Sequence, residues 1–163
     1  MMDRRLFLTA SAAALATAFE TSWFAAAAPG AETFKVTHTP AEWKKRLTAE
    51  QYNVLREEGT EPAGTSPLLD EHRNGVFVCA GCDLDLFSSS TKFDSGTGWP
   101  SFWEPVPHAV GTQSDSSYGM RRTAVFCAQC GGHLGHVFDD GPKPTGLRYC
   151  MNGVALKFKA AIA

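Results

Sequence analysis

The sequence predicts a small, mainly antiparallel β domain that follows a short N-terminal helical segment. Three observations lead to this prediction. Two helix-start patterns occur before residue 60. From Gly75 onward, short runs rich in β-branched and aromatic residues alternate with glycine-rich turns. Two C-x-x-C pairs, Cys79/Cys82 and Cys127/Cys130, present four thiols and indicate that one metal ion holds the domain together.

The first 27 residues are predicted to form an export signal of the twin-arginine type. Arg4 and Arg5 precede a short apolar stretch, and small residues at positions 25–27 offer a cleavage site. Glu20 interrupts the stretch, which is therefore shorter than the ~20 apolar residues of a membrane span. We expect a periplasmic protein without stable membrane insertion, the alternative being an uncleaved anchor.

Charge and composition exclude some classes of partner. The chain carries 15 Lys and Arg against 17 Asp and Glu, a net charge of −2, and its basic residues form no cluster. This composition does not favour nucleic acid or an anionic membrane surface as a partner. After removal of the signal, about 135 residues remain, enough for one domain with a modest core. We expect a monomer.

Residues 28–38 are predicted to be a linker, and residues 39–163 the domain. Thr39 followed by a proline, and by Glu42 three residues on, is typical of a capped helix start. Thr48 and Gln51 repeat this pattern, and Gly59 is the expected end of the second helix.

Strands are expected in the second part of the chain. The clearest runs cover residues 76–78, 125–126 and 154–158, and the last alternates apolar and polar residues with a period of two. Glycine-rich turns at 95–98 and 131–132 separate the strands. The pattern predicts mainly antiparallel pairing.

The four paired cysteines have the ligand pattern of a structural zinc site. Each C-x-x-C pair follows a predicted strand, and four sulfur ligands would leave zinc no open coordination position. The 44 residues between the pairs imply that the ion closes a long loop of the same domain. Two disulfides, or redox-active pairs, are the alternative in an oxidising compartment.

The fifth cysteine, Cys150, has no partner of this kind. Alone it could be an inert buried thiol. Arg148, two residues away, would share its side of a strand and favour the thiolate. His133 and His136 lie three apart in a glycine-rich stretch, which raises the prospect of acid–base chemistry.

Several motifs resemble those of the B-type peptide-methionine (R)-S-oxide reductases. They are GGHLGHVFDDGP at 131–142, GLRYCMN at 146–152, FDSGTGWPSF at 93–102 and WKKRLT at 43–48. The resemblance runs from about Trp43 to Phe158. It implies two antiparallel β-sheets with one structural Zn²⁺, and the reduction of methionine-R-sulfoxide in peptides, oxidised proteins or the free amino acid.

The resemblance also implies roles for single residues. Cys150 matches the nucleophile, which would attack the sulfoxide sulfur and become a sulfenic acid. His136 or His133 would supply the proton, and Asn152 matches a further polar active-site residue. Matches on the substrate-binding side are Trp99, which packs against the S-methyl group, and the supporting residues Arg148 and Asp140.

One position departs from the family pattern. Many members carry a second cysteine where this chain has Thr97, and that cysteine resolves the sulfenic acid as a disulfide. With four cysteines assigned to zinc, Cys150 has no intramolecular partner, and we expect an external thiol or a thioredoxin-like protein to reduce it.

Two other classes of function remain open from the sequence. A zinc-stapled binding module with an incidental thiol would show no turnover. A thiol–disulfide oxidoreductase that uses the C-x-x-C pairs would bind no zinc.

Overall fold

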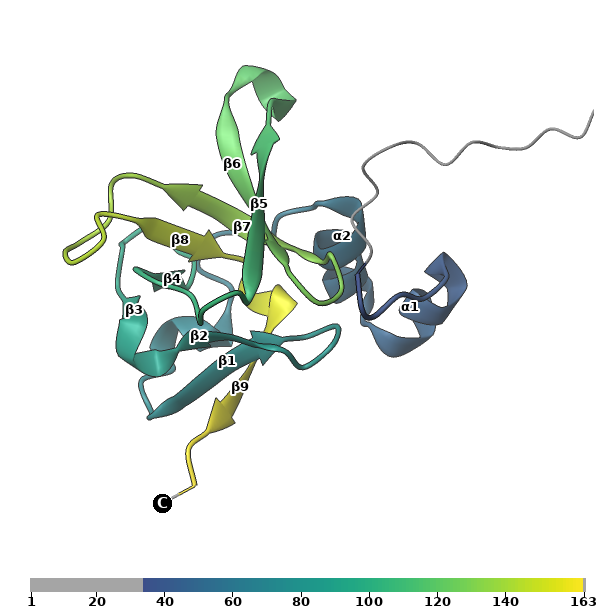
Figure 1. Ribbon diagram of the computed structural model, residues 1–163, viewed down its shortest axis with the longest axis horizontal. Helices are drawn as coiled ribbons and strands as arrows, with labels where there is room; N and C mark the ends of the chain where they lie inside the picture. Colours follow the sequence, from purple (N-terminus) through teal and green to yellow (C-terminus); the bar gives the residue numbers. More distant parts are fainter. Residues whose placement is uncertain (1–33, 163) are drawn as a thin grey trace, which may run out of the picture. The chain divides into compact units, whose positions relative to one another are not determined.

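The structure is a computed structural model that describes residues 34–162 (Figure 1). The predicted signal peptide, residues 1–27, and the first part of the predicted linker lie outside the described residues. Within 34–162, no helix has the length and apolarity that crossing a membrane requires.

Both predicted helices are present, and each begins with the predicted capping box. In α1 (Pro40–Arg46), the Glu42 carboxylate accepts the backbone N–H of Thr39 at 2.8 Å. In α2 (Ala49–Glu57), the Thr48 hydroxyl accepts the backbone N–H of Gln51 at 3.2 Å. These bonds satisfy amide groups that the first helical turn leaves without partners.

The end of α2 differs by one residue from the prediction. The left-handed residue that stops the helix is Glu58, with φ 56°, and not Gly59. Gly59 donates its backbone N–H to the Asn53 carbonyl at 2.9 Å, and a Cβ atom there would lie 2.2 Å from the Asn53 side chain. A side chain at this position would have to displace the exposed side chain of Asn53.

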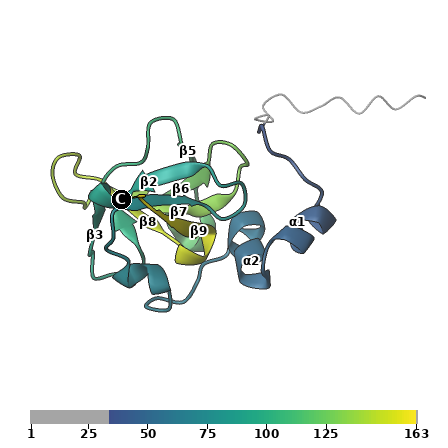
Figure 2. The same ribbon diagram turned by 90° about the horizontal axis from the view of Figure 1, so that it is seen from below.

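The strands form two antiparallel sheets, as the resemblance implied (Figures 1 and 2). The three-stranded sheet has the order β2 (Asp85–Ser88), β1 (Gly75–Cys79), β9 (Leu156–Ala160). The six-stranded sheet has the order β3 (Lys92–Phe93), β4 (Ser101–Phe102), β8 (Arg148–Met151), β7 (His133–Phe138), β6 (Arg122–Cys127), β5 (Val110–Asp115). Four 3₁₀ turns complete the elements: η1 (Pro67–Asp70), η2 (Ser89–Thr91), η3 (Ser117–Gly119) and η4 (Gly153–Ala155).

Two of the three predicted strands are confirmed, and the third begins later than expected. Residues 76–78 lie in β1 and residues 125–126 in β6. In the predicted strand 154–158, Val154 and Ala155 belong to η4 instead, because the backbone N–H groups of Gly153 and Val154 both bind the carboxylate of Glu61. Strand pairing resumes only at Leu156.

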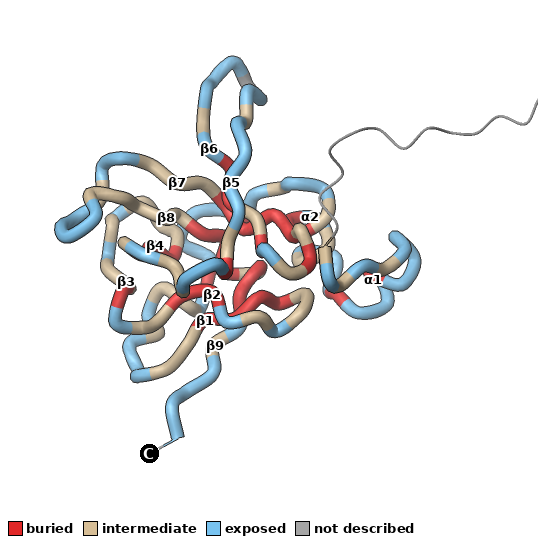
Figure 3. The backbone as a smooth tube through the Cα atoms, in the orientation of Figure 1, coloured by how far each residue is buried: buried red, intermediate tan, exposed pale blue. Residues whose placement is uncertain are grey.

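The core lies between the two sheets, where the buried segments gather in Figure 3. Phe77 of β1 and Phe87 of β2 meet Phe102 of β4 from the other sheet. Phe87 stacks on Phe102 with ring centroids 4.4 Å apart, and Phe77 meets Phe102 edge to face at 5.0 Å. Contacts of this kind fix the position of β4, and so of its neighbour β8.

The described end of the predicted linker is part of the domain. The Val36 N–H donates to the Gln129 carbonyl at 3.0 Å, and the Phe34 ring covers Gly131. The His38 ring meets Trp43 edge to face at 4.7 Å. Residues 34–38 of the expected linker 28–38 therefore pack on the domain, although their sequence shows no periodic pattern.

Candidate active site and metal centre

The four paired cysteines come together where the two sheets meet. Cys79 ends β1 of the three-stranded sheet, and Cys127 ends β6 of the six-stranded sheet. Cys82 and Cys130 follow in the adjoining turns. Their sulfur atoms all lie within 4.8 Å of one another, and the structure thus confirms the predicted cluster.

The spacing of the sulfur atoms fits one metal ion. Sγ of Cys79 lies 3.7 Å from Sγ of Cys130, and Sγ of Cys82 lies 3.5 Å from Sγ of Cys127. A tetrahedral ZnS₄ site with Zn–S bonds of about 2.3 Å has sulfur–sulfur edges of about 3.8 Å. A disulfide has an S–S length of about 2.05 Å, and all five cysteines are free thiols. The disulfide alternative does not match this arrangement.

The electrostatics of the cluster also call for a cation. Hydrogen bonds from the neighbouring thiols, that of Cys127 first, and burial raise the pKa of the Cys79 thiol. A bound cation reverses this effect and holds coordinating sulfur as thiolate. The donor set is thus suited to a soft divalent ion with four sulfur ligands.

Cys150 lies at the centre of the six-stranded sheet. In β8 it is paired with Ser101 of β4 on one side and with His136 of β7 on the other. Its half-buried side chain opens into a pocket of about 110 Å³. The pocket is lined by Thr60, Trp99, Arg122, Gly135, His136, Phe138, Cys150 and Asn152. Four predicted site residues therefore share one pocket: Cys150, His136, Asn152 and Trp99.

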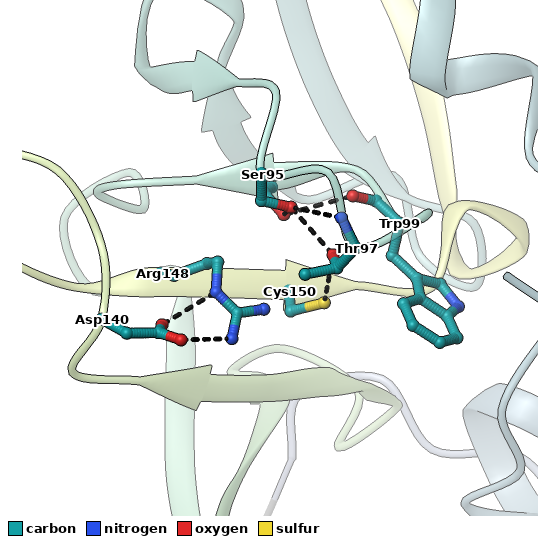
Figure 4. Close-up of polar contacts among 7 residues, drawn as sticks. Ser95, Thr97, Trp99, Asp140, Arg148 and Cys150 are labelled. Atoms are coloured by element: carbon teal, nitrogen blue, oxygen red, sulfur yellow. Dashed lines mark hydrogen bonds and ion pairs between the residues drawn. The ribbon is translucent and has the colours of Figure 1, made fainter. Parts of the chain in front are cut away.

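Arg148 and Asp140 form an ion pair beside Cys150 (Figure 4). Nε and Nη2 of Arg148 donate to the two carboxylate oxygens of Asp140, each at 2.8 Å. This pairing lowers the pKa of Asp140 and raises that of Arg148, which also interacts with the Cys150 side chain. Neither residue lines the pocket: Arg148 reaches Cys150 from along β8, and Asp140, after β7, holds Arg148.

The two histidines have different places. His136 lines the Cys150 pocket, and its Nε2 lies 2.8 Å from Oδ2 of Asp115. His133 is only 2% exposed, and neither of its ring nitrogens has a hydrogen-bond partner within the described part of the chain. Burial, and secondly His136, lower the pKa of His133 to about 4, so it is neutral at neutral pH.

His133 lines a second cavity behind His136. This cavity has a volume of about 350 Å³ and is polar, with Glu58, Thr60, Asp115, Ser117 and Arg122 among its lining residues. It shares Thr60, Arg122 and His136 with the Cys150 pocket. The two cavities therefore meet at the His136 ring, with His133 on the far side.

Asp115 and Arg122 are functional residues that sequence reasoning missed. Oδ2 of Asp115 binds both His136, at 2.8 Å, and Nη2 of Arg122, at 2.6 Å. Hydrogen bonds from the side chain and backbone of Ser117, and then from His136, lower the pKa of Asp115. The two residues face each other at the end of the β5–β6 hairpin, seven residues apart, and no motif in the sequence announces this pair.

Glu61 is the second omission, and it ties the pocket together. Its backbone N–H donates to Oδ1 of Asn152 at 2.9 Å, and its carbonyl accepts Nε1–H of Trp99 at 3.1 Å. Its carboxylate, 6% exposed, accepts the N–H groups at the start of η4. These contacts span 38 to 93 residues of sequence, so no local pattern could reveal them.

Comparisons with known proteins agree with this arrangement. A family model described as the SelR domain matches residues 47–160. The chain is 55% identical over 127 residues to a peptide methionine sulfoxide reductase MsrB of Leptospira interrogans, covering 77% of this chain and 97% of the relative. It is 56% identical over 126 residues to an MsrB of Agrobacterium fabrum, covering 77% of this chain and 93% of that relative. A chloroplastic peptide methionine sulfoxide reductase B1 of Arabidopsis thaliana is 57% identical over 120 residues, covering 73% of this chain and 59% of the plant protein.

Proposed function

Since this chain belongs to the SelR-domain family of methionine sulfoxide reductases, we propose that it reduces methionine-R-sulfoxide, preferably in peptides, with Cys150 as nucleophile. The observation that carries the proposal is the pocket itself. It holds one free thiol, one imidazole with a carboxylate behind it, and one indole. The thiol would attack the sulfoxide sulfur, the imidazole would give a proton to its oxygen, and the indole would contact its methyl group.

The reaction starts at the sulfoxide sulfur. The Cys150 thiolate attacks this sulfur while a proton from His136 reaches the sulfoxide oxygen, so that the S–O bond can break. The attack joins the two sulfur atoms, and the oxygen leaves as water after it takes a second proton from solvent. Water then adds to the Cys150 sulfur and breaks the bond between the two sulfur atoms, so that methionine leaves, Cys150 becomes a sulfenic acid and one proton returns to solvent. Two-electron reduction of the substrate thus matches two-electron oxidation of the cysteine.

His136 is the acid that the geometry favours over His133. His136 lines the pocket, and the carboxylate of Asp115, 2.8 Å from its Nε2, holds the ring in place. His133, with its lowered pKa, is neutral and is separated from the pocket by His136. In this proposal it supports the position of His136 and does not supply the proton.

Trp99 would set the stereochemistry. Its ring edge is held by the hydrogen bond to Glu61, so the indole has a fixed orientation at the pocket wall. With the methyl group on the indole and the oxygen at His136, only one epimer presents its sulfur to Cys150. We assign this epimer as R.

The sulfenic acid would be returned to the thiol by an external reductant. The other four cysteines belong to the metal cluster, and Thr97 lies beside Cys150 where a resolving cysteine would stand. Two equivalents of a small thiol, or one reduced thioredoxin-like protein, would give back the thiol and release water.

The metal site would hold one Zn²⁺ through Cys79, Cys82, Cys127 and Cys130. Zinc with four sulfur ligands supplies structure and takes no part in the reaction. We also propose that Arg4 and Arg5 direct the protein through the twin-arginine route to the periplasm, which replacement of both by lysine and fractionation of cells would test.

The proposed function is tested with separated epimers of a methionine sulfoxide peptide. With excess dithiothreitol, the protein should convert the R epimer and leave the S epimer, and Cys150→Ser should remove turnover while zinc content stays unchanged. Conversion of the S epimer would refute the stereochemical assignment. Absence of turnover with either epimer would refute the reaction itself.

A further inference from the structure

Three hydroxyl groups form a chain that ends on the sulfur of Cys150 (Figure 4). Ser101 Oγ lies 2.7 Å from Ser95 Oγ, and Ser95 Oγ lies 2.8 Å from Thr97 Oγ1. Thr97 Oγ1 lies 3.7 Å from Sγ of Cys150, within the range of a hydrogen bond to sulfur. At the other end, the Ser101 hydroxyl can donate to the carbonyl oxygen of Trp99 at 3.1 Å.

The number of protons in this chain fixes its direction. Each hydroxyl has one proton to donate, and the carbonyl of Trp99 can only accept. If Cys150 is a thiol, every bond can point the same way, from the thiol through Thr97, Ser95 and Ser101 to the carbonyl. If Cys150 is a thiolate, Thr97 must donate to sulfur and Ser95 must then donate to Thr97. Ser101 can complete the reversal by turning from the Trp99 carbonyl to donate to Ser95.

We propose that Thr97, Ser95 and Ser101 are a hydroxyl relay that reverses when Cys150 ionises, so that Thr97 becomes a catalytic residue that donates a hydrogen bond to the thiolate. Only hydroxyl rotations are involved. The proton of the thiol leaves to solvent, because the carbonyl of Trp99 cannot take one up. Each hydroxyl in the reversed chain strengthens the next, since hydrogen bonds in series polarise one another.

The surroundings of the relay support this role. Ser101 is fully buried in β4, directly opposite Cys150 in the strand register, and Ser95 and Thr97 are partly buried. Water therefore competes little for the hydroxyl at the buried end of the relay. At the other end, the hydrogen bond from Thr97 to a charged sulfur would be stronger than one between neutral groups.

Other charged groups also act on Cys150, and the relay is additional to them. Arg148 lies on the same strand and interacts with the Cys150 side chain, with Asp140 paired to it. His136, held by Asp115, lies opposite Cys150 on β7. Arg122 lines the same pocket as Cys150. All five residues stay unchanged in the variants below, so a difference between variants reports on the hydroxyls.

The inference rests on the proposed function only for the reason why the relay would be useful, because a nucleophilic cysteine reacts as the thiolate. Its test needs no sulfoxide. The rate of alkylation of Cys150 by iodoacetamide is measured from about pH 6 to about pH 10 on the zinc-loaded protein, by mass spectrometry of the peptide that contains Cys150. The proteins compared are the unmodified chain, Thr97→Val, Thr97→Ser and Ser95→Ala.

We expect Thr97→Val to react about tenfold more slowly near pH 7, because less thiolate is present without the hydrogen bond. Near pH 10, where the thiolate dominates, it should react at least as fast as the unmodified protein. Thr97→Ser should restore the original profile, and Ser95→Ala should show a smaller slowing near pH 7.

Two results for Thr97→Val would overturn the inference: an unchanged rate near pH 7, or an equal slowing at both pH values, which would indicate lost access to the sulfur. An unchanged profile in Ser95→Ala would overturn the relay. Ser95→Ala also decides the question if Thr97→Val does not fold. If the alkylation profiles are as expected but the unmodified protein does not reduce methionine sulfoxide, the proposed function is refuted and the relay is still supported.

Discussion

Asp115 has the most direct influence on the proposed acid, because one of its oxygens binds His136 and Arg122 together. The lowered pKa of Asp115 keeps it ionised at every pH at which the protein would work. An ionised carboxylate beside an imidazole favours the protonated ring and fixes its orientation. At this scale the site is the Cys150 sulfur with a hydroxyl on one side and, on the other, an imidazole held by a carboxylate.

Replacement of Asp115 by asparagine should therefore weaken proton donation. We expect Asp115→Asn to lower kcat for the R epimer by about tenfold or more, with little change in KM. The loss should persist across the pH profile, because the carboxylate that orients the His136 ring is then absent at every pH. Steady-state rates between about pH 6 and about pH 9 measure this, with exposed Asp139→Asn as the matched control. A profile like that of the control would contradict the role of Asp115.

The lowered pKa of His133 leads to a prediction about the stability of the fold and not about the rate of the reaction. Its pKa of about 4 in the folded protein lies below the ~6.5 of an unfolded chain, so between these values the unfolded state binds more protons. Stability must then fall as the pH falls through this window, by about 3 kcal/mol at most. Urea titrations of the unmodified protein and of His133→Gln, at several pH values, should show the smaller dependence in the variant. Exposed His72→Gln should behave as the unmodified protein, and an equal dependence in all three would refute the argument.

Among the elements, the segment between α2 and η1 organises the pocket, although it is neither helix nor strand at Glu61. Glu61 reaches Asn152 and η4 on one side and Trp99 on the other. Its main chain holds the two pocket side chains, and its buried carboxylate holds the turn that follows β8. Loss of the carboxylate should loosen both walls of the pocket at once.

Glu61→Gln should be less stable and a poorer enzyme. The glutamine side chain can accept one of the two N–H bonds but presents an amide donor to the other, which leaves a buried group unsatisfied at a cost of about 1–3 kcal/mol. We expect a raised KM for peptide sulfoxides together with this loss of stability, measured by urea unfolding and steady-state kinetics. Exposed Glu57→Gln at the end of α2 is the control. Wild-type stability and KM in Glu61→Gln would show that Glu61 does not organise the site.

The elements also show how far sequence reasoning reaches. The starts of α1 and α2 were predictable because a capping box lies within four residues. The stop after Glu57 was misplaced by one residue, because Glu58 itself takes the left-handed conformation. Val154 and Ala155 were taken for the start of a strand, because a tertiary contact with Glu61 decides the conformation there. Cys150 and His136 could be singled out from local composition and resemblance. Asp115 and Glu61 could not, since their partners are 21 and 91 residues away.

In the molecule as a whole, the four-cysteine cluster joins residues of one sheet to residues of the other, and a metal ion bound there would hold the sheets together. Cys79 belongs to the end of the three-stranded sheet and Cys127 to the end of the six-stranded sheet. The ion would thus supplement the aromatic contacts of Phe77 and Phe87 with Phe102. The active site lies within the six-stranded sheet and depends on that packing only indirectly.

Removal of the metal should therefore destabilise the fold before it affects chemistry. We expect Cys82→Ser to lose zinc and to lower the free energy of unfolding by about 5 kcal/mol or more, with Tm lower by about 15 °C or more. Cys150→Ser is the matched control and should keep both zinc and Tm. Calorimetry and metal analysis of the two variants measure this. A Cys82→Ser protein with unchanged zinc content, or with unchanged Tm after losing zinc, would contradict the structural role of the metal.

In the proposed reaction one thiol, that of Cys150, reduces methionine-R-sulfoxide without a second cysteine of the same chain. A single turnover without added reductant tests it most directly, by mixing reduced, zinc-loaded protein with the R epimer of a methionine sulfoxide peptide. Methionine formed and free thiols lost are counted per protein, and the mass of the Cys150 peptide is determined. We expect that each protein molecule forms about one methionine, loses one thiol and gains one oxygen on Cys150. Loss of two thiols, with a disulfide between Cys150 and one of the other cysteines, would contradict it.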